Sequence, residues 1–199
     1  MISSFEIRRK VFHVCLGLIL SCGLYFGYFN WILIGVVTLL GGGVVLLTLH
    51  TRLPFISWFL EKFERPQYIK SFPGRGIFFF FLSATLVSLL FSLDIAVASI
   101  LILTFGDSAA HLVGAGLGRR RNPLSIGPVR MFEGLIAGIV CGMFAALLVV
   151  PFWLAFFGSL CALIVESIAI RIGGVQIDDN LLIPLIAGAV MSWMAFALF

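Results

Sequence analysis

Long apolar segments follow one another along nearly the whole sequence, and they limit the folds open to this chain more than any other feature. A helix needs roughly 20 mostly apolar residues to cross the hydrocarbon core of a bilayer. About seven segments satisfy this rule, at residues 11–29, 31–49, 77–93, 95–104 with a continuation through a run of small residues, 133–150, 152–170 and 181–199. The sequence therefore predicts an all-α fold, a polytopic membrane bundle of about seven transmembrane helices.

The composition agrees with a membrane location. Of the 199 residues, 61% are hydrophobic and only 11% are charged, which excludes an ordinary soluble domain. No polar linker separates the apolar segments, so residues 1–199 are expected to form a single transmembrane domain. The net charge of +4 does not indicate nucleic-acid binding. The basic residues lie between apolar segments, where they set topology and meet anionic lipid headgroups.

The connections between the apolar segments differ in charge on the two sides of the predicted membrane. One set is very short, with Asp94 as its only charge, and comprises residues 28–30, 92–94 and 150–151. The basic residues fall on the other side, at positions 8–10, 52–75, 119–121 and 171. Lysine and arginine collect in cytoplasmic loops, so the N-terminus is expected in the cytoplasm and the C-terminus outside.

Residues 51–66 differ in kind from the other connections. Leu53, Ile56 and Leu60 recur at helical spacing, with Glu61 and Lys62 on the opposite side. This pattern indicates either an interfacial helix lying along the membrane surface or a polar-faced connector.

Polar groups concentrate in residues 104–134, between two apolar segments. Asp107 and His111 are four residues apart and share a face of a helix. Small residues also recur every fourth position, at Gly106, Ala110, Gly114 and Gly118. Such a stripe serves helix packing in membranes. Its combination with carboxylates and with Arg119, Arg120, Arg121 and Arg130 also suits a metal-bound polyphosphate, because Mg²⁺ prefers oxygen ligands and guanidinium groups bind phosphate.

Further acids are expected on the same side of the membrane as the arginines. Glu166 lies about one turn inside the cytoplasmic end of the sixth segment, and Asp178, Asp179 and Asn180 stand at the head of the last one, where Asn180 is a candidate helix cap. Together with Asp107 and Glu133 they have the composition of a magnesium-dependent phosphoryl or nucleotidyl transfer centre.

The first segment contributes Glu6, Arg9, Lys10 and His13 on roughly one face. Arg9 and Lys10 are typical topology determinants. His13 lies deeper, where an unpaired imidazole costs free energy, so it is expected to meet a partner such as Glu6 or a carboxylate of another helix.

These motifs, taken in order, resemble one known family of membrane enzymes. They comprise Phe105-Gly106-Asp107-Ser108-Ala109-Ala110, Gly114, Gly118-Arg119, Glu133-Gly134, Glu166, Asp178-Asp179-Asn180 and Ile183-Pro184, preceded by Glu6, Arg9-Lys10, His13 and Gly17. The sequence resembles the dolichol kinase, phytol kinase and CTP-dependent diacylglycerol kinase family over nearly its whole length. The resemblance implies an integral membrane enzyme with its active site on the cytoplasmic side. Such an enzyme moves the terminal phosphate of a nucleoside triphosphate, typically CTP, to a lipid alcohol.

Under this resemblance the candidate residues take distinct roles. Asp107 and Asp179 are the expected catalytic residues and Mg²⁺ ligands, with Glu133, Glu166 and Asp178 assisting the metal. The expected nucleotide and phosphate ligands are Gly114, Gly118, Arg119, Arg130 and Asn180. Arg9, Lys10, His13 and His111 are expected to be accessory. Arg130 departs from the family, which commonly carries lysine in that neighbourhood.

Three alternative functions compete with a lipid-alcohol kinase. Phosphatidate cytidylyltransferases share the central pattern, but their Lys-Asp pair and Pro-Gly-His-Gly-Gly-like run are missing here. A small transporter is a second alternative, although only one interrupted segment is found where transporters often have a matching pair. A non-catalytic lipid-binding scaffold is the third.

Overall fold

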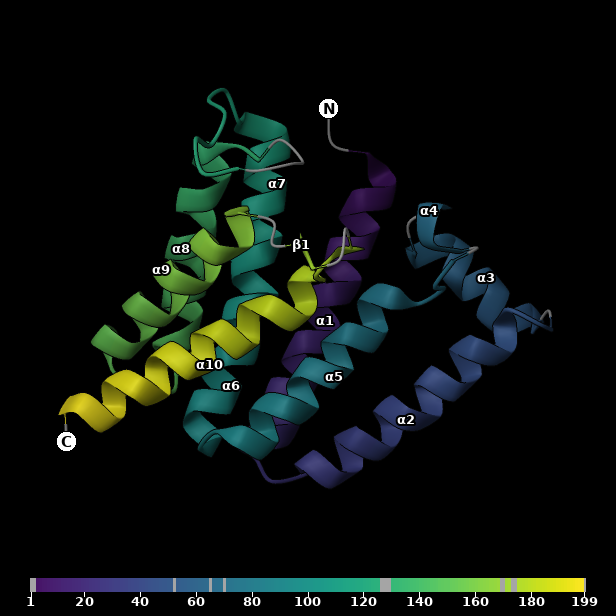
Figure 1. The fold of residues 1–199 in the computed structure, drawn as a ribbon, viewed down its shortest axis with the longest axis horizontal. Coiled ribbons are helices and arrows are strands. Elements are labelled where there is room, and N and C mark those ends of the chain that lie inside the picture. Colours follow the sequence, from purple (N-terminus) through teal and green to yellow (C-terminus); the bar gives the residue numbers. More distant parts are fainter. Residues whose placement is uncertain are drawn as a thin grey trace.

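The computed structural model describes residues 3–51, 53–64, 66–69, 71–125, 130–168, 171–172 and 175–198. These residues are almost entirely helical (Figure 1), which confirms the all-α class. The helices are α1 (Ser4–Tyr25), α2 (Trp31–Thr48), α3 (Pro54–Phe63), α4 (Pro66–Ile69), α5 (Arg75–Leu90), α6 (Leu93–Leu101), α7 (Ser108–Leu117), α8 (Phe132–Ala146), α9 (Phe152–Ile168) and α10 (Asp179–Leu198). A π-helical segment, η1 (Ile102–Asp107), joins α6 to α7. Before α10, the two-residue strands β1 (Arg171–Ile172) and β2 (Val175–Gln176) pair antiparallel, with Arg171 opposite Gln176.

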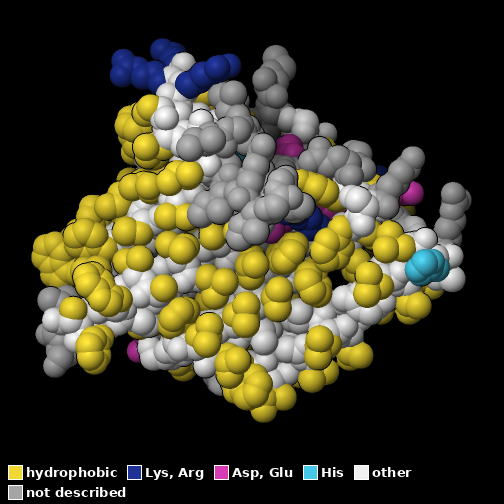
Figure 2. Space-filling view, in the orientation of Figure 1, with side chains coloured by type: hydrophobic (Ala, Val, Ile, Leu, Met, Phe, Trp, Pro, Cys, Tyr) yellow, Lys and Arg dark blue, Asp and Glu magenta, His cyan; other side chains and the backbone are white. Residues whose placement is uncertain are grey.

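Within the described ranges, three helical stretches are long and apolar enough to cross a bilayer, namely Trp31–Thr48, Leu93–Leu117 and Asp179–Ala197. Three further apolar helices are shorter, at Arg75–Leu90, Phe132–Ala146 and Phe152–Ile168. Figure 2 shows hydrophobic side chains spread over much of one face, with lysine and arginine side chains at its upper left edge and near its centre beside acidic ones. These features support a helical membrane protein, and the seven-span arrangement stays a prediction.

The stretch Leu93–Leu117, which combines α6, η1 and α7, is the central helix of the bundle. In the most apolar part of this stretch 67% of the residues are buried inside the protein, whereas the corresponding share for Trp31–Thr48 is 11%. It packs against α1, α8 and α10, because every side of α6 carries apolar or small residues. The π-helical turn η1 ends at Asp107. Such turns inside α-helices often occur at functional sites, since they change the direction in which the following side chains point.

Small residues bring the central helix and α8 into close contact. A Cβ atom at Gly138 would lie 2.9 Å from the carbonyl oxygen of Gly106 and 2.8 Å from Cβ of Ala110. A Cβ atom at Gly134 would lie 2.9 Å from Cα of Gly114. The packing interpretation of the small-residue stripe is therefore confirmed from Gly106 to Gly114.

Helix α3 occupies most of residues 51–66 and shows the predicted amphipathic pattern. Leu60 is buried, whereas Phe55 and Trp58 are exposed. On the inner side, the Phe12 ring of α1 lies 5.3 Å from the Phe59 ring and 5.0 Å from the Phe63 ring, measured between centroids. The helix is thus anchored to α1, and its position at a membrane surface stays a prediction.

The contact between α8 and the central helix predicts that Gly138→Val destabilises the protein. The added side chain overlaps backbone and Ala110, and overpacking of this kind costs about 1–3 kcal/mol. Thermal unfolding in detergent micelles measures the loss. Gly43→Val is the matched control, because a Cβ at Gly43 in α2 meets nothing within 4 Å. Equal midpoints for both variants would contradict the close approach.

Candidate active site

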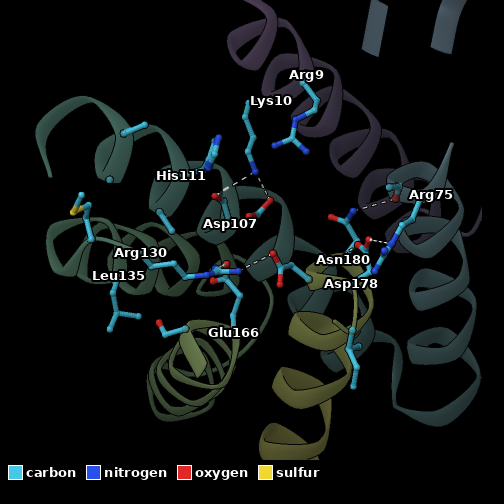
Figure 3. A pocket seen from close by; sticks show the side chains of 18 of the residues that line it. Arg9, Lys10, Arg75, Asp107, His111, Arg130, Leu135, Glu166, Asp178 and Asn180 are labelled. Atoms are coloured by element: carbon cyan, nitrogen blue, oxygen red, sulfur yellow. Dashed lines mark hydrogen bonds and ion pairs between the residues drawn. The ribbon is translucent and has the colours of Figure 1, made fainter. Parts of the chain in front are cut away.

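A cavity of about 490 Å³ lies at the end of the bundle where α1 and α10 begin and α7 ends. Its size is within the usual range for small-molecule sites. Acidic and basic side chains from distant parts of the sequence line it together (Figure 3). The charged lining residues are Arg9, Lys10, Glu64, Arg75, Asp107, Arg130, Glu166, Asp178 and Asp179.

Asp107 and Lys10 form a buried ion pair on one wall of the cavity. The Lys10 Nζ donates to Oδ2 of Asp107 at 2.5 Å, and the two side chains point toward each other in Figure 3. Lys10 is only 5% exposed. The Nε2 atom of His13 lies 3.6 Å from the same carboxylate oxygen. The partner expected for His13 is therefore Asp107 rather than Glu6.

Glu6 instead joins α1 to α7. Its Oε2 accepts a hydrogen bond from Nη2 of Arg9 at 2.8 Å and lies 3.0 Å from Nε2 of His111. Arg9 and His111 both line the cavity. The face of α1 that the sequence predicted thus meets the face of the central helix that carries Asp107 and His111.

Arg130 connects two acids that stand far apart in the sequence. Its Nη1 forms an ion pair with Oε1 of Glu166 in α9, and its Nη2 donates to Oδ2 of Asp179 in α10 at 2.8 Å. Glu166 is almost fully buried, at 3% exposure. A buried carboxylate needs such a partner, because the loss of hydration is costly without one.

Asp178 and Asn180 attach the start of α10 to α5. Nε of Arg75 donates to Oδ2 of Asp178 at 3.0 Å, and the Asn180 side chain donates to the carbonyl of Gly76 at 3.0 Å. The backbone N–H of Asn180 donates to Oδ1 of Asp178. Asp178 therefore caps α10, and the prediction of Asn180 as the cap is wrong, because its amide is used across the helix interface.

Burial raises the pKa of Asp178 to about 6, and the neighbouring charge of Asp179 acts in the same direction. The hydrogen bonds from Arg75 and from the Asn180 N–H act against this rise in the pKa.

Four residues of the predicted site lie outside the lining of this cavity, namely His13, Gly118, Arg119 and Glu133. Arg119 is exposed, and a side chain at Gly118 would run into Met131. Both Glu133 oxygens accept the backbone N–H of Arg120, at 3.2 and 3.3 Å. The chain around them turns back on itself, with the Asn122 N–H donating to the Arg130 carbonyl. The turn brings Arg130 to the cavity and leaves Arg119 and Glu133 outside it.

The remaining predicted acids do not form a metal site by themselves. Across the part of the chain that the structure describes, no three His, Cys, Asp or Glu side chains group as metal ligands. Asp107, Asp178 and Asp179 each face a cation instead. Mg²⁺ in nucleotide-dependent enzymes is often held by one or two carboxylates plus substrate phosphates. Asp107 and Asp179, which line the same cavity, fit that mode of binding.

Three residues that were not predicted as site residues also line the cavity, namely Glu64, Tyr68 and Arg75. Arg75 lies over the Tyr68 ring, 4.9 Å from its centroid. Glu64 is buried at the end of α3 and accepts the N–H of Gly76 at 3.4 Å. Glu64 belongs to residues 51–66, which were interpreted as an interfacial helix or connector, and Arg75 to the basic residues that set topology. Nothing in the sequence singled out Tyr68.

No family model, curated protein or solved structure matches this chain.

The two ion pairs of Arg130 predict that replacing Arg130 alone destabilises the protein more than replacing Arg130 together with Glu166. Arg130→Met leaves Glu166 buried without its cation, and breaking a buried pair costs about 3–5 kcal/mol. In Arg130→Met/Glu166→Met the uncompensated charge is gone, so the double variant should be more stable than Arg130→Met alone. The stabilities of the single and the double variant are measured by thermal unfolding in detergent and by the fraction of protein that elutes as a monodisperse species on gel filtration. A double variant no more stable than the single one would contradict the pairing.

Proposed function

We propose that this chain is a magnesium-dependent membrane kinase that transfers the terminal phosphate of a nucleoside triphosphate, CTP, to a lipid alcohol. The candidate acceptors are a polyprenol such as dolichol, the single-chain alcohol phytol, and diacylglycerol. The observation that carries this proposal is the cavity at one end of an apolar bundle, in which Arg9, Lys10, Arg75 and Arg130 stand among carboxylates. Arginine and lysine suit phosphate oxygens, and the surrounding apolar helices suit a lipid.

The proposed membrane arrangement has seven spans, formed by α1, α2, α5, the central helix, α8, α9 and α10. The N-terminus is on the cytoplasmic side, because lysine and arginine collect there. The cavity then faces the compartment that contains nucleotides and Mg²⁺. The exposed Asp94 at the start of α6 belongs to the opposite side.

The cations of the cavity bind the triphosphate by exchanging partners. Lys10 and Arg130 neutralise Asp107 and Asp179. A triphosphate offers these cations stronger acceptors, since charge-assisted hydrogen bonds to phosphate are short and numerous. Asp107 and Asp179 would hold a Mg²⁺ ion that accompanies the phosphates, and such an ion would supply positive charge against the charge that develops during transfer.

The transfer itself needs little more than position and charge. The acceptor hydroxyl oxygen forms a bond to the terminal phosphorus while the bond from that phosphorus to the bridging oxygen breaks. The nucleoside diphosphate leaves, and Asp107 takes the hydroxyl proton. Binding both reactants side by side supplies most of the acceleration in reactions of this type.

Incubation of the purified protein with γ-labelled CTP, Mg²⁺ and each lipid alcohol tests the proposal. Label should enter the organic phase, CDP should be released, and removal of Mg²⁺ by a chelator should abolish both. Release of pyrophosphate with phosphatidate would instead indicate cytidylyl transfer. Absence of label in every lipid, from protein that elutes as a folded species, contradicts the kinase.

Replacement of the proposed base gives a second prediction. Asp107→Asn removes the proton acceptor and also the charge that pairs with Lys10, so kcat, measured on protein that elutes as a folded species, should fall by about 10²–10⁴-fold. Asp94→Asn makes the same chemical change at the start of the central helix, outside the cavity lining, and should keep full activity. Unchanged turnover in Asp107→Asn would remove Asp107 from the reaction.

The seven-span topology predicts that the two termini lie on opposite sides of the membrane. Protease added to intact cells should remove an epitope tag from the C-terminus and leave one at the N-terminus untouched. After permeabilisation both tags should be removed. Protection of both tags in intact cells, or cleavage of both, would exclude an odd number of spans.

A further inference from the structure

Three consecutive arginines, Arg119, Arg120 and Arg121, have no part in the proposed phosphate transfer. They follow α7 almost directly, and all three are exposed. None of them lines the large cavity. Figure 2 shows lysine and arginine side chains projecting from the upper left edge of the molecule, where Figure 1 shows the end of α7. A run of three positive charges therefore faces outward.

A short hairpin, formed by residues 118–125 and 130–132, holds these arginines away from the cavity. The backbone N–H of Asn122 donates to the carbonyl of Arg130 at 2.9 Å. Arg121 and Met131 are opposite each other in an antiparallel bridge. Arg130 and Met131 both line the cavity. The returning arm of the hairpin thus serves the cavity, and the first arm presents the three arginines outside it.

No acid of the described chain pairs with the three arginine side chains. Across the residues that the structure describes, the ion pairs all involve other cations. Glu133, which follows the hairpin on α8, directs both carboxylate oxygens at the backbone N–H of Arg120 and not at a guanidinium group. Three adjacent positive charges without such partners attract an anionic ligand or surface.

Exposed apolar side chains border the arginines. Leu117, the last residue of α7, is 71% exposed, and Leu124 and Phe132 are exposed as well. Figure 2 shows hydrophobic side chains just below the projecting basic ones. A soluble anion offers no contact to such side chains, whereas a bilayer surface presents hydrocarbon next to phosphate. The composition of this surface therefore favours a lipid partner.

The length of the central helix places the hairpin among lipid headgroups. The stretch Leu93–Leu117 comprises 25 residues. At a rise of about 1.5 Å per residue it spans about 37 Å. The hydrocarbon core of a bilayer is about 30 Å thick, and the headgroup layers extend it to about 40–45 Å. A helix that enters the core near Leu93 therefore ends at the level of the phosphate groups on the other side.

We propose that the outer face of this hairpin binds anionic phospholipids of the cytoplasmic leaflet. The guanidinium groups of Arg119, Arg120 and Arg121 bind the headgroup phosphates, because their planar donors match phosphate oxygens. Leu117 and Leu124 rest against the adjoining hydrocarbon. The inference uses the proposed orientation of the chain in the membrane and does not depend on the kinase reaction.

Lipid binding to the purified protein in neutral detergent tests the proposal. Dioctanoyl phosphatidylglycerol is added, and native mass spectrometry counts the bound lipids. Dioctanoyl phosphatidylcholine, which has the same chains and no net charge, is the comparison. Phosphatidylglycerol should bind more tightly, and this preference should decrease as the concentration of ammonium acetate rises, because salt screens exposed charges.

A pair of double variants separates the hairpin from the other basic residues. Arg120→Gln/Arg121→Gln removes two charges and keeps the backbone bonds of the hairpin. Arg8→Gln/Lys62→Gln removes two exposed cations elsewhere and is the matched control. Since each basic residue near an anionic surface adds to the attraction, the first variant should bind phosphatidylglycerol about 10–30-fold more weakly. Its binding of phosphatidylcholine should not change, and the control should bind both lipids as the wild type does.

Three outcomes overturn the proposal. Equal weakening in both double variants would show a general attraction by basic residues. Displacement of phosphatidylglycerol by an equal concentration of inorganic phosphate would indicate a phosphate site instead of a lipid surface. Absence of any preference for phosphatidylglycerol in the wild type would remove the anionic partner. None of these measurements uses nucleotide, so the kinase proposal and the lipid surface can each fail without the other.

Discussion

The buried ion pair between Lys10 and Asp107 is the interaction on which the rest of the site depends. Either charge alone would be costly at this depth in the bundle, and together they satisfy each other. The pair fixes α1 against the central helix at the π-helical turn that ends with Asp107. Both side chains line the large cavity, so the position of α1 against the central helix determines how its charged groups are arranged.

The other acids of the cavity follow the same rule of pairing. Arg130 joins Glu166 to Asp179, and Arg75 joins α5 to Asp178. These pairs hold together helices that come from distant parts of the sequence. They also keep each cation ion-paired with a carboxylate inside the same cavity. Such an arrangement can bind a ligand that brings both phosphate and Mg²⁺. A polyphosphate can take over the cations, and its metal can take over the acids.

Much of the site was predictable, because charges are rare in an apolar sequence. Asp107, Glu166 and Asp179 stood out for that reason, and all three line the cavity. Glu133 was equally prominent but pairs with the backbone of Arg120, since the chain turns back before α8. Arg75 was missed because a cation beside an apolar segment is usually a topology determinant, and its contact with Asp178 spans more than one hundred residues.

The sequence by itself determined a helical membrane chain whose charged residues gather toward one end. Apolar segments of that length admit few other structures, since backbone groups in lipid must be hydrogen-bonded internally. Only the tertiary structure decided which acid meets which cation, that Asp178 rather than Asn180 caps the last helix, and that His13 approaches Asp107. Those outcomes depend on how the packed helices are rotated and how far they are shifted along one another. Close glycine contacts and one π-helical turn set this arrangement, and the periodicity of a single segment does not encode it.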